Sequence, residues 1–307
     1  MTPPRRLAMS LPFILPAAAG AAAAAERRET WRDAARDRDV PVLLRLPAGE
    51  APAPLVLVSH GLGGSREGMA FLGQAMAAAG FIAVHLQHLG SDSAIWRGAS
   101  DPVSGMRNAG RDPLVAANRL LDVPFALDEA QRRLGARIDP ARIAIAGHSF
   151  GSWTAQHALG QALPLSLPRI PDARLRAGIL LSPVLGFFGP PAANAIRVPL
   201  LHITGTEDRT LLDRAGPEER LAIFEAIAGT PQAAAIFAGA GHLAFAGREE
   251  AGAGHVAPTF HARTAALAVL FLRAALLADA EAAAEIGRGA SALLQPGDRL
   301  TTKDWVG

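Results

Sequence analysis

Residues 145–151 read IAGHSFG and decide how this chain folds. The last five letters form a G-x-S-x-G motif centred on Ser149, after a short apolar stretch and before a stretch of helical spacing. A serine on a strained strand-to-helix turn needs glycines at both ends of the motif, because side chains there would collide with neighbouring backbone. Gly147 and Gly151 meet that requirement, so the motif predicts Ser149 as a nucleophile. The alternative is an ordinary serine at a helix N-terminus.

Around this motif, continuously apolar stretches alternate with stretches of helical spacing. The expected strands are residues 40–46, 55–59, 81–85, 143–146, 177–181, 200–204 and 233–237. The expected helices are residues 67–79, 113–134 (which Pro124 should kink or split), 150–159 and 258–278. Continuously apolar strands are typical of a sheet covered on both faces, and the alternation favours parallel pairing. We therefore expect an α/β class fold, a doubly wound, mostly parallel sheet with helices on both faces, as one domain over residues 26–307.

A serine nucleophile needs a base, and the base needs a carboxylate that orients it. In a strand–serine–helix fold both groups follow the serine in the chain, each in a loop after a strand. Asp208 ends the sequence GTED after an expected strand and is the expected carboxylate, with Glu207 and Asp213 as rivals. His242 lies in GAGHL after the next expected strand and is the expected base. The alternative for His242 is a histidine of a surface loop.

The oxyanion formed during acyl transfer must be held by backbone N–H groups. One should come from Phe150, the residue after the nucleophile. The other should come from the loop after an early strand, where residues 60–64 read HGLGG, and we expect the N–H of Leu62. The glycines of this loop allow the backbone to approach the substrate. His60 could assist catalysis, but we favour a role in packing the loop.

The first 25 residues have the organisation of an export signal. Arg5 and Arg6 give a positive start, residues 7–15 are apolar but broken by Pro12, and residues 17–25 offer several A-x-A cleavage sites before the charged residues 26–28. The stretch is too short and broken to span a membrane stably. We expect an exported protein, periplasmic or secreted, and leave the general and twin-arginine routes open. A frayed alanine-rich helix is the alternative.

Composition narrows the chemistry. The 307 residues include no cysteine, which excludes a disulfide scaffold, a thiolate zinc site and a cysteine nucleophile. The pI of about 10.2 arises because the chain has no tyrosine and a single lysine, Lys303, so few groups titrate between histidine and arginine. Apart from Arg5 and Arg6, basic and acidic residues are equal in number. A nucleic acid partner is therefore not expected.

Motifs for a metal or a phosphate cofactor are also absent from the sequence. It contains neither H-E-x-x-H nor a phosphate loop of the GxxxxGK[ST] type. His85, His88 and Asp92 form a weak metal candidate, for which we favour a loop beside the active site. We expect no cofactor and no metal.

Five stretches together resemble a known superfamily: SHGLGGSREGM, FIAVHLQHLGSDS, AGHSFG, ITGTED and GAGHLAF. They are similar to the α/β-hydrolase superfamily and, more narrowly, to predicted dienelactone hydrolases, which are close to platelet-activating-factor acetylhydrolases and cutinase-like polyester hydrolases. The resemblance implies Ser149 as nucleophile, Asp208 as acid and His242 as base. Dienelactone hydrolases use a cysteine nucleophile, which this chain lacks, so dienelactone is not the expected substrate. Nor does the chain have tyrosine to line a polyester cleft.

These inferences predict a serine hydrolase that cleaves carboxylic esters through an acyl-enzyme. A small-molecule or lipid-like ester is the expected substrate, with the stretches 87–111 and 161–174 as walls of its pocket. The same triad could act on an amide, thioester or lactone, because the triad does not choose the bond. A non-catalytic binding protein with a hydrolase fold is a further alternative. The sequence gives no sign of an oligomeric state.

Overall fold

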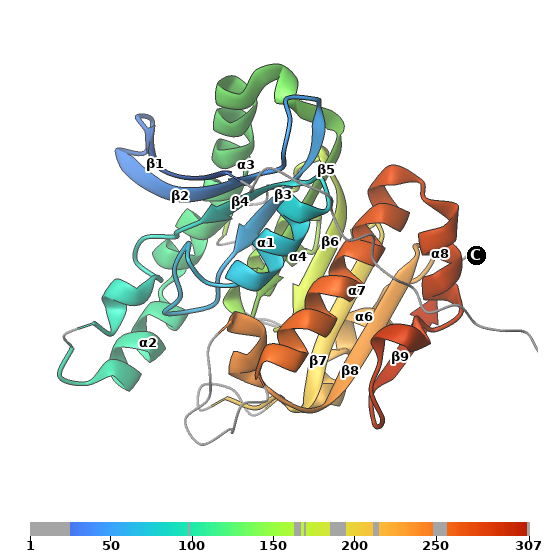
Figure 1. The fold of residues 1–307 in the computed structure, drawn as a ribbon. Helices are drawn as coiled ribbons and strands as arrows, with labels where there is room; N and C mark the ends of the chain where they lie inside the picture. The colour runs from blue at the N-terminus through green and yellow to red at the C-terminus, as the bar shows by residue number, and fades with distance from the viewer. Residues whose placement is uncertain are drawn as a thin grey trace, which may run out of the picture.

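The computed structural model describes residues 25–97, 99–162, 167–168, 170–184, 195–210, 215–247 and 257–305. The expected export signal, residues 1–25, lies outside this set except for Ala25, and so does Asp213. Figure 1 shows a twisted sheet with helices packed on its two faces.

Nine strands of the described chain form one sheet in the order β1-β2-β4-β3-β5-β6-β7-β8-β9. Their bounds are β1 Ala25–Asp33, β2 Arg38–Leu46, β3 Ala53–Ser59, β4 Ile82–Leu86, β5 Ile138–His148, β6 Leu175–Leu181, β7 Leu200–Glu207, β8 Gln232–Gly241 and β9 Arg299–Lys303. The neighbours from β4 through β3, β5, β6 and β7 to β8 are all parallel. The pairs β1–β2, β2–β4 and β8–β9 are antiparallel. The doubly wound, mostly parallel sheet that the sequence predicts is therefore present.

Helices cover both faces. Their bounds are α1 Ala70–Ala78, α2 Pro102–Arg111, α3 Pro113–Leu134, α4 Phe150–Ala158, α5 Pro217–Arg220, α6 Ala222–Ala226, α7 Ala257–Leu277 and α8 Ala280–Gly287. In Figure 1, α1 and α7 lie in front of the sheet, with α3 and α4 behind it. Side chains of a central strand point alternately to the two faces of the sheet and so join two separate cores. In β3, Val56 and Val58 pack with α1 and α7, whereas Leu55 and Leu57 pack with α3. Two-sided burial explains why these strands are apolar at every position.

Several boundaries differ from the sequence-based expectation. Helix α1 begins at Ala70 rather than at residue 67, because residues 66–69 form a turn in which Met69 has a left-handed φ of 55°. Pro124 does not split α3, which is one helix over Pro113–Leu134. The edge strands β1 and β9 were not predicted, since their exposed polar residues give no apolar run and only pairing with β2 and β8 reveals them.

Helix α7 is the only described helix long and apolar enough to cross a membrane, over Thr259–Leu277. In this structure 56% of that window is buried. Leu267, Phe271 and Leu272 have no exposed surface and belong to the core formed with β6, β7 and β8. The apolar composition of α7 is therefore explained by packing against the sheet.

Candidate active site

Ser149 sits at the turn between the carboxyl end of β5 and the start of α4. Its backbone has φ 53° and ψ −117°, a conformation that L-residues rarely adopt. A Cβ on Gly147 would collide with the carbonyl oxygen of Gly151, and a Cβ on Gly151 would collide with the carbonyl oxygen of Ser59. The two glycines of the motif are thus required by backbone contacts, as the sequence pattern predicts. The close contact of Gly151 with Ser59 also brings α4 against the end of β3.

This contact gives a first prediction. Gly151→Ala should destabilise the protein by about 3 kcal/mol or more, because the new methyl group meets backbone that cannot move aside. Gly80→Ala is the matched control: its Cβ enters open space, so only the left-handed φ of 91° is penalised, by about 1–2 kcal/mol. Urea unfolding of both variants measures the difference, and equal losses would contradict the steric account.

The expected acid and base meet at the carboxyl ends of β7 and β8. The ring of His242 donates through Nδ1 to Oδ1 of Asp208, at 2.7 Å. The other carboxylate oxygen of Asp208 accepts from the Thr204 hydroxyl, also at 2.7 Å. Asp208 is fully buried, whereas its rival Glu207 is exposed. Of the two rivals, Asp213 lies outside the described residues, and Asp208 alone is shown bonded to His242.

A buried arginine supports this carboxylate. Nε of Arg220, from α5, lies 3.0 Å from Oδ1 of Asp208 and donates to its backbone carbonyl at 3.1 Å. Burial by itself raises the pKa of Asp208, but the hydrogen bond from His242 and the charges of His242 and Arg220 outweigh it and lower the pKa to about 2. Asp208 is therefore ionised at neutral pH and fixes the His242 tautomer with its proton on Nδ1. Nε2 of His242 is then left as a proton acceptor.

Ser149 and His242 line the same cavity, of about 630 Å³. No hydrogen bond between their side chains is recorded in this structure, so the shared cavity is what brings them together. The walls carry apolar and aromatic side chains beside the glycine-rich loop after β3: Leu62, Met69, Trp96, Met106 and Leu243. A largely apolar cavity with a few polar groups at one end is typical of a small-molecule site.

The two expected oxyanion donors lie on facing segments. Leu62 lines the cavity, and within the described chain its N–H has no hydrogen-bond partner. The next two N–H groups of the loop are occupied: Gly63 donates to the Ser91 carbonyl at 2.8 Å and Gly64 to the Gly61 carbonyl at 3.0 Å. Leu62 is therefore a loop donor available to a ligand. Phe150 is the first residue of α4, where backbone N–H groups point out of the helix end.

His148, within the motif, has a position that sequence reasoning did not assign. Its Nε2 donates to the backbone carbonyl of His242 at 3.0 Å, and the two rings are 4.7 Å apart. Burial lowers the pKa of His148 to about 3, with the charge of His242 acting in the same direction. A neutral His148 thus anchors the loop that carries the expected base. The position of His148 beside Ser149 in the sequence could have indicated a role in the site. Nothing in the sequence indicated a role for Arg220, because that role depends on its contact with Asp208 in the folded chain.

The predicted pocket walls are correct only in part. Trp96 and Met106 of the stretch 87–111 line the cavity, on either side of the start of α2. No described residue of the stretch 161–174 lines it, so that expectation is wrong for this part of the chain. His88 is not part of a metal cluster with His85 and Asp92, because it bonds Asp122 instead. Among the residues that the structure describes, no group of three histidine or acidic side chains suits a metal ion.

Comparison with known proteins bears on the fold. No protein-family model matches the chain, and no curated protein is similar to it in sequence. Among solved structures, a ferulic acid esterase from Streptomyces cinnamoneus matches with a TM-score of 0.62, over 82% of this chain and 89% of that one. This chain therefore has an α/β-hydrolase fold. Sequence identity to the esterase is 19%, so the likeness concerns the fold alone, and the chemistry has to be argued from the site.

Proposed function

We propose that this protein is a serine hydrolase that cleaves carboxylic esters. The observation that carries the proposal is the His242–Asp208 hydrogen bond at 2.7 Å, placed in the same cavity as a serine on a strained strand-to-helix turn. A histidine with a buried carboxylate behind it and a serine in front of it is the arrangement by which hydroxyl nucleophiles are activated. The likeness to an esterase in fold is consistent with this chemistry.

In the proposed mechanism Ser149 Oγ attacks the acyl carbon of the ester while Nε2 of His242 removes its proton. The N–H groups of Leu62 and Phe150 hold the oxyanion, an effect of about 3 kcal/mol for each donor in hydrolases of this type. The tetrahedral intermediate collapses as His242 passes its proton to the leaving alcohol. Water then attacks the acyl-enzyme by the same route, which releases the acid and restores Ser149. Asp208 stays ionised throughout and stabilises the imidazolium.

The experiment for this proposal is a panel of substrates in which one acyl group is joined to three kinds of leaving group, with a lactone as the fourth type of bond. Butyryl oxygen esters, thioesters and anilides would be compared with a lactone, and methyl ferulate would be added because the structurally similar protein is a ferulic acid esterase. We expect kcat/KM to be highest for an oxygen ester. A higher kcat/KM for the anilide, thioester or lactone would show that this bond, and not the oxygen ester, is the one the enzyme cleaves. A folded protein that hydrolyses none of them would favour the binding-protein alternative.

We also propose that the chain is similar in function to the predicted dienelactone hydrolases and platelet-activating-factor acetylhydrolases, which its sequence motifs resemble. The apolar cavity walls fit a small acyl group or a short lipid-like chain, and the charged residues that line the cavity are Glu67, Arg97 and Arg209. We therefore place the substrate among small or lipid-like esters.

We also propose that residues 1–25 direct export and are then removed. The supporting observation is the order of charged, apolar and small residues in the sequence. N-terminal sequencing of the protein from cell fractions tests this. A mature N-terminus near residue 26 outside the cytoplasm is the expected result. An intact N-terminus in the cytoplasm would contradict it.

A further inference from the structure

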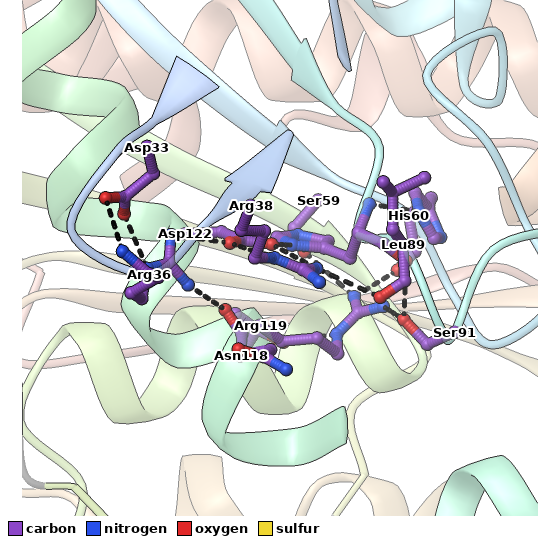
Figure 2. A network of polar contacts seen from close by, with 12 residues as sticks. Asp33, Arg36, Arg38, Ser59, His60, Leu89, Ser91, Asn118, Arg119 and Asp122 are labelled. Carbon is purple, nitrogen blue, oxygen red and sulfur yellow. Dashed lines mark hydrogen bonds and ion pairs between the residues drawn. The ribbon is translucent and has the colours of Figure 1, made fainter. Parts of the chain in front are cut away.

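A buried polar network adjoins the loop that carries Leu62, and one of its members, His60, also lines the cavity. Its centre is Arg119 and Asp122, one turn apart on α3, and both side chains are fully buried. Figure 2 shows the network running from Asp33 and Arg36 at one end to His60 and Ser91 at the other. Ionic groups are rarely buried without a specific arrangement of partners, so the network needs an explanation.

Part of this network has the hydrogen-bond order of a catalytic triad. His88 donates through Nδ1 to Oδ2 of Asp122 at 2.9 Å, and its Nε2 accepts from the Ser59 hydroxyl at 2.9 Å. However, all three side chains are fully buried and none lines the cavity. The Ser59 oxygen also accepts a hydrogen bond from Arg119, at 3.0 Å, which stabilises the oxygen where it is. These residues therefore do not form a second nucleophilic site, and their role is structural support.

Arg119 holds the loop after β3 from behind. Its Nη2 donates to the His60 carbonyl at 2.5 Å as well as to Ser59, and its Nη1 donates to the Ser91 hydroxyl at 2.8 Å. The carbonyl of Ser91 in turn accepts the Gly63 N–H at 2.8 Å. Leu62 is thus flanked by two backbone groups, at His60 and Gly63, whose positions depend directly or through Ser91 on one guanidinium.

The same guanidinium also holds the start of α4. Its Nε donates to the Thr154 hydroxyl at 3.0 Å, and that hydroxyl donates to the Phe150 carbonyl at 2.9 Å. The Arg119 guanidinium lies over the Phe150 ring, 4.4 Å from its centre, as in a cation–π contact. Four of its five N–H donors are therefore satisfied by three segments that are far apart in sequence: residues 59–60, Ser91 and Thr154.

We propose that Arg119 is the positioning residue of the oxyanion hole, which fixes the backbone of Leu62 relative to that of Phe150. The inference rests on the proposed function, because it assigns those two N–H groups to the oxyanion. Oxyanion donors stabilise the transition state only when their geometry is set in advance, and a rigid planar fork that bonds both segments sets it. Asp122, paired with Arg38 at 2.9 and 3.0 Å, in turn supplies the nearby negative charge that Arg119 needs.

Arg119→Lys tests the inference, because it keeps the charge and loses the fork. We expect kcat for the best ester to fall by about tenfold or more with KM nearly unchanged, since the lost interaction acts in the transition state. The inhibition constant of phenylboronic acid, which forms a tetrahedral adduct with an active-site serine, should rise by a similar factor. Both values are corrected for the concentration of active sites, which is measured by fluorophosphonate titration. If Arg119 has only a structural role, the substitution lowers the melting temperature and leaves both corrected values unchanged.

Arg36→Gln is the matched control at the other end of the network. Arg36 pairs with Asp33 at 2.5 Å and with Asp122 at 2.9 Å, but it touches neither the Leu62 loop nor α4. The variant should lose stability while kcat and the boronate constant stay within about twofold of wild type. If Arg119→Lys does not fold, the double variant Ser91→Ala/Thr154→Val decides, because it removes the bonds of the guanidinium to Ser91 and Thr154 and leaves those to Ser59 and His60. It should lower kcat by about threefold or more at constant KM.

The outcomes separate this inference from the proposed function. If wild type hydrolyses esters and Ser149→Ala does not, the proposed function holds. If the folded Arg119 or double variant then keeps wild-type kcat and boronate binding, the positioning role is wrong. If wild type neither hydrolyses esters nor reacts with the fluorophosphonate, the proposed function fails, and the positioning role fails with it.

Discussion

Ser149→Ala should lower kcat for the best ester by about 10⁴-fold or more, with the fold intact. The substitution removes only the hydroxyl oxygen, which has no recorded hydrogen-bond partner within the described chain, so the folded structure loses no bond. The free energy of unfolding should therefore stay within about 0.5 kcal/mol of wild type. Steady-state kinetics and urea unfolding on the same preparations measure the two quantities.

Ser291→Ala is the control for this variant. Ser291 is exposed and lies outside the cavity, so the change should alter neither kcat nor stability. If Ser149→Ala hydrolyses esters at roughly a tenth of the wild-type rate or faster, the hydroxyl is not essential, and Ser149 is not the nucleophile.

The second large effect is a loss of stability in mild acid. Burial is the main cause that lowers the pKa of six described histidines. Four of them lie outside the network of Arg119 and Asp122, and their pKa values fall to about 3 for His85 and His148 and to about 4 for His157 and His202. In the unfolded chain these rings titrate near 6.5, so between pH 6.5 and 4 the unfolded state binds more protons than the folded state. Their stabilising contribution is complete above pH 6.5 and is lost as the pH falls towards the folded pKa values.

The magnitude follows from linkage: each such histidine contributes about 1.4 kcal/mol per pH unit below 6.5. Between pH 7 and pH 5 the four together should lower the free energy of unfolding by roughly 8 kcal/mol, comparable to the total stability of many domains. Asp208, with its pKa lowered to about 2, adds a further loss only below about pH 4. Urea unfolding at the two pH values measures the slope.

His157→Gln is the matched control for the pH effect. The Nδ1 of His157 donates to the Gln161 carbonyl at 3.0 Å, and a glutamine amide can make the same kind of bond without titrating. On unfolding near pH 5 the variant should take up about one proton fewer than wild type, which makes the pH dependence of its stability shallower. Equal urea midpoints for wild type at pH 7 and pH 5 would show that the buried histidines are not kept neutral by the fold.

The three residues of the proposed triad could be picked out from the sequence because each has a local signal. Ser149 lies between two glycines, and Asp208 and His242 each follow an apolar strand, which places all three at one edge of a parallel sheet. Their meeting in the folded chain requires only the strand order that the pattern implies.

The supports of the site could not be predicted in the same way. Arg119 and Arg220 lie in helical stretches where nothing in the local sequence distinguishes them from surface arginines. Their roles depend on the His60 carbonyl and the Asp208 carboxylate, which only the folded chain brings into contact with them. His148 was visible beside Ser149, but its bond to the backbone of His242 joins residues 94 positions apart. For the same reason the strand β9 has no local signal: Arg299–Lys303 reads RLTTK, and only pairing with β8 makes it a strand.

The most direct test of the central claim is labelling by a fluorophosphonate, read by intact mass, on wild type and Ser149→Ala side by side. The account predicts one adduct on wild type and none on the variant, because only an activated serine reacts with this probe. A folded wild type that gains no adduct, or a variant that is labelled as fast as wild type, would contradict the assignment of Ser149 as the nucleophile.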